Sequence, residues 1–256
     1  MYDDISVSLR HRQLASLPDE LARYTKLRRL DATGNALTTL PAWLGNLLHL
    51  EEIHADGNQL AALPENIGQL ANLKILSAYH NQLVSLPASL GQLTGLEELS
   101  LGSNQLTSLP EWFWELTNLR VLNIAENRLS SLSANIGNLT HLHTLDIAHN
   151  ELTVLPDELG NLQNLTYFLY LSNNKLTTLP DALGNLGKLR YLNATDNQLS
   201  ALPETLGNLT SLIELRLYNN RLTVLPESLG NLSKLKELHM QNNRLISLPA
   251  SPGNLT

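Results

Sequence analysis

Residues 96–110 read Leu-Glu-Glu-Leu-Ser-Leu-Gly-Ser-Asn-Gln-Leu-Thr-Ser-Leu-Pro, and variants of this phrase recur along the chain. Its central asparagine belongs to a series spaced 23 residues apart: Asn35, Asn58, Asn81, Asn104, Asn127 and Asn150, and then Asn174, Asn197, Asn220 and Asn243. Only the step from Asn150 to Asn174 is 24 residues. A fixed period of roughly 20 to 50 residues is typical of repeat architectures. The sequence therefore predicts a stack of similar units.

Each repeat divides into two halves with different apolar patterns. The first half alternates apolar and other residues with a period of two, as at Leu99 and Leu101, which indicates a short, half-buried strand. The second half carries Leu-Pro followed by Leu-Gly-Asn-Leu, as in residues 152–162. Proline is tolerated at the first helical position and glycine is favoured where a helix ends, so this half predicts one short helical or 3-10 turn. We therefore expect an α/β solenoid with a parallel sheet on one face.

The recurring asparagines follow directly after the expected strands. Their carboxamides can both donate and accept hydrogen bonds, so they can satisfy backbone groups of adjacent coils as an asparagine ladder. We expect a structural role for this column rather than contacts to a ligand.

The period covers nearly the whole chain and predicts one continuous domain over residues 1–256. Residues 1–26 form a degenerate N-terminal repeat, with Arg12 at the asparagine position. Residues 27–248 hold ten repeats, and residues 249–256 are an incomplete final repeat with Pro252 where leucine is expected. Without a polar capping unit, either more protein follows or the last coil exposes leucines that promote self-association.

This pattern resembles the leucine-rich repeat family. The 23-residue form with Leu-Pro and Leu-Gly-Asn-Leu is similar to the bacterial and intracellular scaffold type, including the plant intracellular Ras-group repeats. The Gly-x-Ile-Pro sequence of plant receptor repeats is absent after the asparagine. The resemblance implies a horseshoe with a concave parallel β-sheet, short helical or 3-10 turns on the convex side, and a protein bound on the concave strands.

Composition limits the functional classes. The chain has 17 Lys+Arg against 24 Asp+Glu, a net charge of −7, without the clustered cations that nucleic acid or an anionic membrane surface requires. It has no cysteine for disulfide-stapled caps or thiolate zinc sites. The sequence shows neither a signal peptide nor a run of about 18 apolar residues that could span a membrane. We expect a cytoplasmic protein, with a secreted effector as the alternative.

Catalytic and cofactor motifs are missing from the sequence. It has no glycine-rich phosphate loop, no nucleophile elbow and no His-Glu-x-x-His helix. His141 and His143 would lie on one side of a strand, but no third ligand is near them in sequence. We therefore predict no enzyme activity, no cofactor and no metal site.

Strand residues between the leucines should face into the concave surface, where large side chains gather in the later repeats. Tyrosine and arginine are enriched at binding hot spots, so these residues are the predicted partner site. The candidates are Phe168, Tyr170, Tyr191, Arg216, Tyr218 and His239, with Tyr79 and His54 in earlier repeats. Alternatively, these aromatic residues only pair across strands and stiffen the sheet.

Two irregularities offer further candidates. The 24-residue step has its extra residue near residues 165–171, which predicts either a bulge at the start of the strand or a neutral insertion in the loop. Trp112 and Trp114 flank Phe113, which takes a leucine position of the outer turn. The tryptophans could form a secondary contact on the convex side, or they could cover local core.

Together these expectations predict a non-catalytic scaffold that recognises a protein or peptide on its concave sheet. The alternative is a targeting module of a larger effector or GTPase-linked enzyme whose catalytic domain lies outside this chain.

Overall fold

The computed structural model describes residues 6–247 and divides into two compact units between Asn127 and Arg128. The predicted incomplete repeat at residues 249–256 lies outside the described residues. Within residues 6–247, no helix has both the length and the apolar character needed to cross a membrane.

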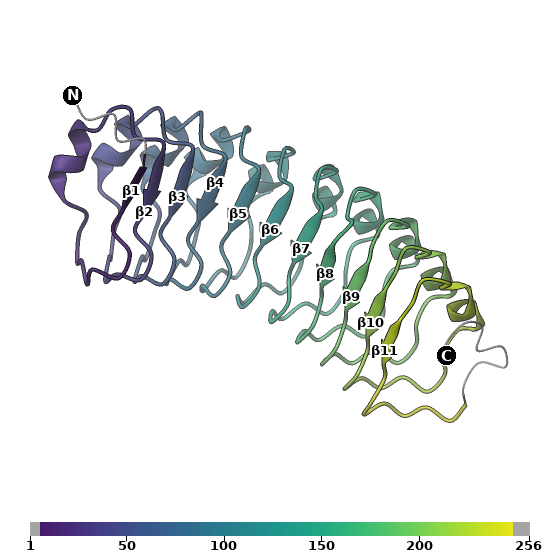
Figure 1. The fold of residues 1–256 in the computed structure, drawn as a ribbon. Helices are drawn as coiled ribbons and strands as arrows, with labels where there is room; N and C mark the ends of the chain where they lie inside the picture. Colours follow the sequence, from purple (N-terminus) through teal and green to yellow (C-terminus); the bar gives the residue numbers. More distant parts are fainter. Residues whose placement is uncertain (1–5, 248–256) are drawn as a thin grey trace. The chain divides into compact units, whose positions relative to one another are not determined.

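The first unit alternates short strands with 3-10 helices (Figure 1). Its strands are β1 (Ser6–Ser8), β2 (Arg29–Asp31), β3 (Glu52–His54), β4 (Ile75–Ser77), β5 (Glu98–Ser100) and β6 (Val121–Asn123). Its 3-10 helices are η1 (Asp19–Arg23), η2 (Ala42–Asn46), η3 (Glu65–Gln69), η4 (Ala88–Gln92) and η5 (Glu111–Glu115). Consecutive strands pair in parallel at the repeat spacing, for example Leu76 opposite Leu99. Residues 6–26, which lack the asparagine, still supply β1 and η1.

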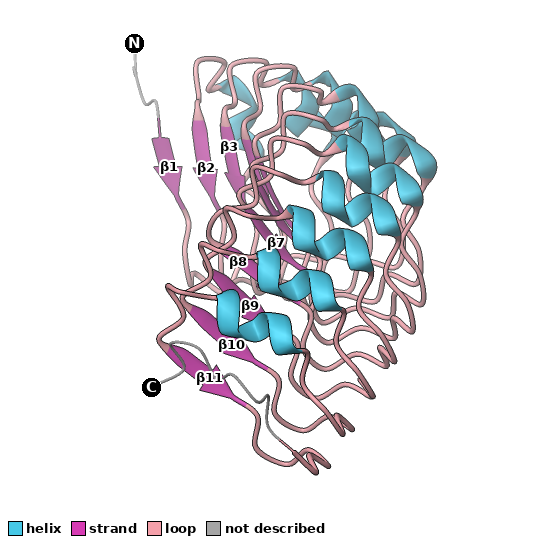
Figure 2. Ribbon diagram, turned by 90° about the vertical axis from the view of Figure 1, so that its right-hand side faces the viewer, coloured by secondary structure: helices cyan, strands magenta, loops and turns pink. Residues whose placement is uncertain are grey.

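The second unit repeats this arrangement. Its strands are β7 (Thr144–Asp146), β8 (Phe168–Tyr170), β9 (Tyr191–Asn193), β10 (Glu214–Arg216) and β11 (Glu237–His239). Its 3-10 helices are η6 (Ala134–Asn138), η7 (Asp157–Asn161), η8 (Asp181–Asn185), η9 (Glu204–Asn208) and η10 (Glu227–Asn231). In each unit the strands form a parallel sheet on one face, and the 3-10 helices lie on the other (Figure 2). The predicted α/β solenoid is confirmed.

Proline and glycine shape the turns for different reasons. Pro64 precedes η3 with φ −68°, the value that its ring fixes, and it opens the turn. The sequence pattern predicts that the glycine of each turn ends the helix. In the structure, Gly68 instead allows close packing between two turns. A Cβ at Gly68 would lie 2.2 Å from the carbonyl oxygen of Ser89 in the next turn. Only a residue without a side chain lets these stacked turns approach so closely.

The core fills the space between sheet and turns. The central strand leucines, such as Leu76 and Leu192, and the turn leucines, such as Leu90 and Leu206, are all 0% exposed. Each fully buried leucine contributes roughly 1.5–3 kcal/mol of hydrophobic stabilisation. Because a coil covers only its neighbours, this stabilisation depends on stacking.

The asparagine column bonds to the backbone of adjacent coils. The side-chain oxygen of Asn81 accepts a hydrogen bond from the Leu60 amide at 3.0 Å. Its Nδ2 donates to the carbonyl oxygens of Ala55 at 3.0 Å and Ala78 at 3.1 Å. Asn81 is only 9% exposed, so these backbone groups have little access to water. One carboxamide thus satisfies groups from two successive repeats.

The extra residue of the 24-residue step lies just before β8. The Arg190 amide donates to the carbonyl oxygen of Thr166 at 3.0 Å, while the next residue, Tyr191, is opposite Phe168. Tyr167 is therefore one extra residue between these two positions, as in a β-bulge at the start of the strand. The bulge leaves the Tyr167 side chain 48% exposed.

The suggestion of a secondary contact through both tryptophans is wrong for Trp114. Its side chain is 1% exposed and has no surface to offer a partner. It packs edge-on against the buried Phe113, with ring centroids 5.3 Å apart. Trp112 is half-buried and lies over Gly91, where a Cβ would come within 3.0 Å of the indole ring. Trp114 therefore covers core.

Candidate functional site: the outward sheet face of the second unit

Strand alternation positions the candidate residues on the outward face of the sheet. Leu169 and Leu192 point into the core and are 0% exposed, while their neighbours on β8 and β9 point away from it. Phe168 is opposite Tyr191 in the register of these strands. Phe168, Tyr170 and Tyr191 are here called the aromatic cluster.

The three rings of the aromatic cluster contact one another. Phe168 and Tyr170, two residues apart on β8, stack with centroids 5.5 Å apart and planes at 11°. Tyr191 meets Phe168 edge-on at 5.5 Å and Tyr170 at 5.3 Å. Such pairs contribute about 0.5–1.5 kcal/mol beyond the burial of their area, so the cluster also stiffens the sheet. Yet Phe168 keeps 40% of its surface exposed, which a purely structural pairing does not require.

Arg216 on β10 extends the cluster with a charged group. Its guanidinium carbon lies 5.5 Å from the centre of the Tyr191 ring, within cation–π range. Its Nε donates to Glu214 Oε1 at 2.5 Å. This hydrogen bond is the main reason that the pKa of Arg216 is raised above its usual range. The arginine is thus held in place by a ring and a carboxylate.

The tyrosine hydroxyls remain neutral donors. Partial burial, with a contribution from Asp146, raises the pKa of Tyr170 above its ordinary value. Partial burial also raises the pKa of Tyr191, although Arg216 acts in the opposite direction. Both phenols can therefore donate hydrogen bonds to a partner across the physiological pH range.

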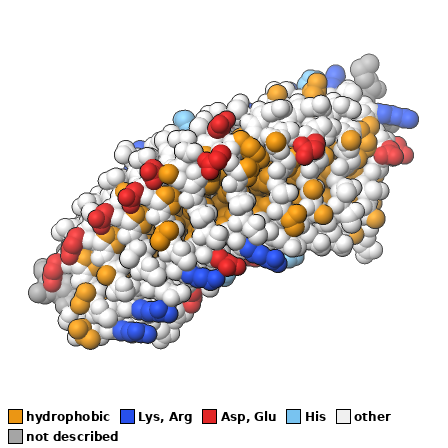
Figure 3. Space-filling view, turned by 180° about the vertical axis from the view of Figure 1, so that it is seen from behind, with side chains coloured by type: hydrophobic (Ala, Val, Ile, Leu, Met, Phe, Trp, Pro, Cys, Tyr) orange, Lys and Arg blue, Asp and Glu red, His pale blue; other side chains and the backbone are white. Residues whose placement is uncertain are grey.

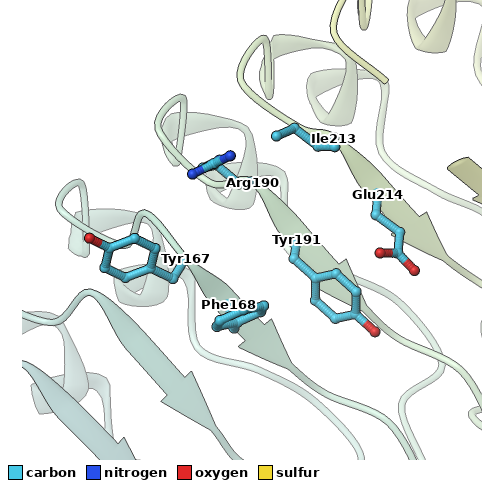
Figure 4. Close-up of a pocket in the computed structure, with 6 residues that line it drawn as sticks. All are labelled: Tyr167, Phe168, Arg190, Tyr191, Ile213 and Glu214. Carbon is cyan, nitrogen blue, oxygen red and sulfur yellow. The ribbon is translucent and has the colours of Figure 1, made fainter. Parts of the chain in front are cut away.

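A pocket opens beside the aromatic cluster (Figure 4). Its volume is about 250 Å³, less than the roughly 300–1,000 Å³ typical of small-molecule sites, so it suits a single side chain. The lining is mostly apolar, with one cation and one carboxylate. It comprises Tyr167, Phe168, Arg190, Tyr191, Ile213 and Glu214.

The structure separates the predicted residues into groups. It brings together Phe168, Tyr170, Tyr191 and Arg216. His239 is opposite Arg216 on β11 and lies 3.2 Å from Glu237, outside the pocket lining. Tyr218 follows β10, and its carbonyl oxygen accepts from the Asp196 amide at 3.1 Å. Tyr218 is likewise outside the pocket lining.

The candidates of the first unit occupy a polar environment. Tyr79 donates from its hydroxyl to Glu126 Oε1 at 2.9 Å. His54 lies 3.5 Å from Glu52 and lines a separate cavity of about 240 Å³. The other residues of this cavity are Arg10, Arg29, Asp31, Thr33 and Asp56.

Asp31, in the lining of this polar cavity, has a lowered pKa. Partial burial acts to raise its pKa, but hydrogen bonds from Thr33 and the nearby Arg10 guanidinium outweigh it and lower the pKa below the usual range.

Four residues of the pocket were not predicted as site residues. Tyr167 reaches it because of the bulge, and the unequal repeat step was the available signal. Arg190 and Ile213 come from the position just before a strand, and Glu214 from the first strand position. On the face opposite to that of Figure 1, Figure 3 shows a row of acidic side chains along one edge, basic side chains mostly along the other edge, and exposed apolar ones between them.

Comparison with solved structures shows strong similarity to repeat proteins. A TDR receptor structure shares 31% sequence identity with a TM-score of 0.87, covering 94% of this chain and 43% of that chain. A leucine-rich repeat protein of Leptospira interrogans shares 28% identity with a TM-score of 0.58, covering 91% and 77%. The plant peptide hormone receptor RGFR1, solved in complex with RGF2, shares 31% identity with a TM-score of 0.72, covering 89% and 42%. This chain therefore spans less than half the length of both receptor structures.

No curated protein matches the sequence significantly. The family model described as "Leucine-rich repeat region" matches residues 12–124, 110–187 and 180–256, which together cover nearly the whole chain. Within the described residues 6–247, the chain forms the repeating strand and 3-10 units of both halves. The chain belongs to the leucine-rich repeat family.

Proposed function

We propose that this protein is a non-catalytic recognition module that binds a protein or peptide on the outward sheet face of its second unit. The observation that carries the proposal is the pocket beside the aromatic cluster, whose lining combines exposed rings with Arg190 and Glu214. Arg216 is held next to this lining by the Tyr191 ring and by Glu214. Aromatic rings and arginine supply large contact areas with polar ends. An apolar side chain of the partner would fill the pocket, and the tyrosine hydroxyls would bond its backbone.

The comparisons favour a peptide or protein as the ligand class. RGFR1 was solved in complex with RGF2, and the receptor kinase HAESA of Arabidopsis in complex with the peptide hormone IDA. Both share 28% identity or more with this chain over at least 89% of its length. A single side-chain pocket on a strand face is compatible with an extended peptide lying across β8 to β10.

The test is a capture experiment from source-cell lysate read by mass spectrometry. The wild type is compared with the triple variant Tyr170→Ser, Tyr191→Ser, Tyr218→Ser and with a single Tyr191→Ser variant. Val224→Ser, at an apolar position that is 45% exposed and outside the pocket, is the matched control. All variants must first melt at the wild-type temperature, within about 2 °C.

We expect the wild type and Val224→Ser to capture the same partner, with at least a tenfold loss for Tyr191→Ser. A loss of about 1.4 kcal/mol in binding corresponds to this factor. Equal capture by all proteins would refute the proposed site and leave the aromatic cluster as a device that stiffens the sheet.

A second proposal is that this surface is the targeting module of a larger effector or GTPase-linked protein. The chain spans less than half the length of the two receptor structures it matches, which motivates this reading. The genomic reading frame tests it. A catalytic domain encoded in frame would support targeting, whereas a frame limited to these repeats would contradict it.

We also propose a bacterial protein of the cytoplasm, or one secreted from it, because the repeat form is similar to that type and the chain has no cysteine. Fractionation of source cells with an antibody to the chain tests the location. Recovery in a membrane fraction would contradict both alternatives.

A further inference from the structure

Three potential metal ligands meet on the last two strands that the structure describes. Glu214 on β10 is directly opposite Glu237 on β11, and Arg216 is opposite His239. Glu237 and His239 are two residues apart on one strand, so both side chains project to the outward face. No sequence motif indicates this set, because Glu214 lies a full repeat from the other two.

The distances between the ligand atoms suit a metal ion. His239 Nε2 lies 3.2 Å from Glu237 Oε2 and 3.8 Å from Glu214 Oε1. One ligand atom from each residue can be chosen so that all lie within 4.8 Å of one another. Bonds of about 2.0–2.2 Å in a tetrahedral arrangement place two ligands of one ion roughly 3.3–3.6 Å apart. Small side-chain rotations therefore bring the three onto one ion.

The charges of the cluster favour a cation. Like charges directly opposite each other on neighbouring strands destabilise a sheet, and Glu214 and Glu237 form such a pair. Arg216 donates to Glu214 Oε1, the same oxygen that lies 3.8 Å from His239 Nε2. A carboxylate oxygen has more than one acceptor site, and Glu214 also has Oε2, so the carboxylate can bond Arg216 and a metal ion together. A hydrogen bond to a ligating carboxylate is the usual second-shell arrangement around a metal.

The first unit contains an incomplete version of this cluster. Glu52 and His54 have the same two-residue spacing on β3, and His54 Nε2 lies 3.5 Å from Glu52 Oε2. The residues opposite Glu52, however, are Arg29 on β2 and Ile75 on β4. Arg29 forms an ion pair with Glu52, so a cation of the protein occupies the place of the third ligand.

We propose that Glu214, Glu237 and His239 form a binding site for a divalent transition-metal ion of the Zn²⁺ class. One imidazole and two carboxylates are a ligand set that Zn²⁺ and Co²⁺ accept, and three protein ligands leave coordination positions open. The side chains of Glu237 and His239 are 59% and 34% exposed, so the open positions face solvent and the ion exchanges freely. This inference does not depend on partner binding.

Isothermal titration of the tag-free, chelator-treated protein with Zn²⁺ tests the site. Titration with Co²⁺, followed by visible absorption, reports the coordination number. We expect one equivalent bound by the wild type, a Co²⁺ spectrum of four- or five-coordinate form, and at least a tenfold weaker affinity for His239→Ala and for Glu214→Gln. His54→Ala is the matched control, and it should bind as the wild type does.

Two results would overturn the proposal. One is the absence of a stoichiometric site in the wild type. The other is equal weakening by His239→Ala and His54→Ala, which would show only nonspecific binding to surface histidines. Because all the substituted residues are at least partly exposed, loss of folding is checked simply by the melting temperature.

Discussion

At the scale of single residues, the position of an asparagine in the repeat determines how much it contributes to the stability of the fold. The Asn81 side chain bonds the backbone of the preceding repeat and of its own repeat and is nearly buried, whereas Asn72 is exposed and makes one bond, to the Leu48 carbonyl oxygen at 2.8 Å. The same carboxamide therefore has a different effect at the two sites. Removing a buried hydrogen-bonding group leaves its partners unpaired, while removing an exposed one lets water replace it.

We predict that Asn81→Ala lowers the free energy of unfolding by about 1–3 kcal/mol, because the Leu60 amide and the Ala55 and Ala78 carbonyls lose a partner. Asn72→Ala should cost less than about 1 kcal/mol. Urea denaturation of both variants measures the difference. Equal costs would contradict a special role for the column.

Asp31 gives a prediction about pH. Its pKa is depressed in the folded state by Thr33 and Arg10, so its stabilising effect is complete above the unfolded pKa of about 3.9 and is lost as the pH falls through the lower folded value. Asp31→Asn should therefore melt below the wild type at pH 7. The difference in melting temperature between the two proteins should become steadily smaller from about pH 5 towards pH 2. Thermal melts at several pH values measure it, and a difference of constant size would rule out this linkage.

At the scale of the elements, the sequence predicted the strands and turns well because one register serves every repeat. The apolar period places Leu99 and Leu122 in successive strands, and the structure pairs them as neighbours. The sequence predicted the pocket poorly. Arg190 precedes β9, which pairs with the bulged strand β8, and Ile213 precedes β10, one strand further along. No single-repeat pattern shows which side chains of these strands converge. Side-chain rotamers across three strands decide that convergence.

The stacked turns provide a prediction at this scale. Gly68→Ala should cost about 1–3 kcal/mol, because the added Cβ would lie 2.2 Å from the backbone oxygen of Ser89 and force η3 and η4 apart. Gly95→Ala is the control. The nearest atom to its Cβ would be Lys74 Nζ at 3.5 Å, the end of a flexible side chain. The denaturation midpoints of the two variants are compared. If Gly68→Ala leaves the midpoint unchanged, the two turns can move apart at little cost in free energy.

At the scale of the whole molecule, stability is distributed along the stack. In each unit, coils pack on and bond to their sequence neighbours, as where the Ala55 amide donates to Ser77 and the Ala78 amide donates to Ser100. Repeat proteins of this kind behave as a chain of local interfaces rather than as one globular core. A destabilising substitution should therefore lower local stability most in its own coil and in the coils next to it.

Leu76→Ala tests this within the first unit. Leu76 is 0% exposed at the centre of β4, so its truncation should cost about 2–5 kcal/mol. In hydrogen exchange, the amides of Ala55 and Ala78, which bond to strands around the cavity, should lose the most protection. The Leu9 amide, which bonds Asp31 near the start of the unit, should lose the least. Val84→Ala, at a position 59% exposed, should change none of these rates. If all three amides lose protection equally, the first unit unfolds as one cooperative block. The prediction that each interface between coils opens with its own free energy would then be wrong.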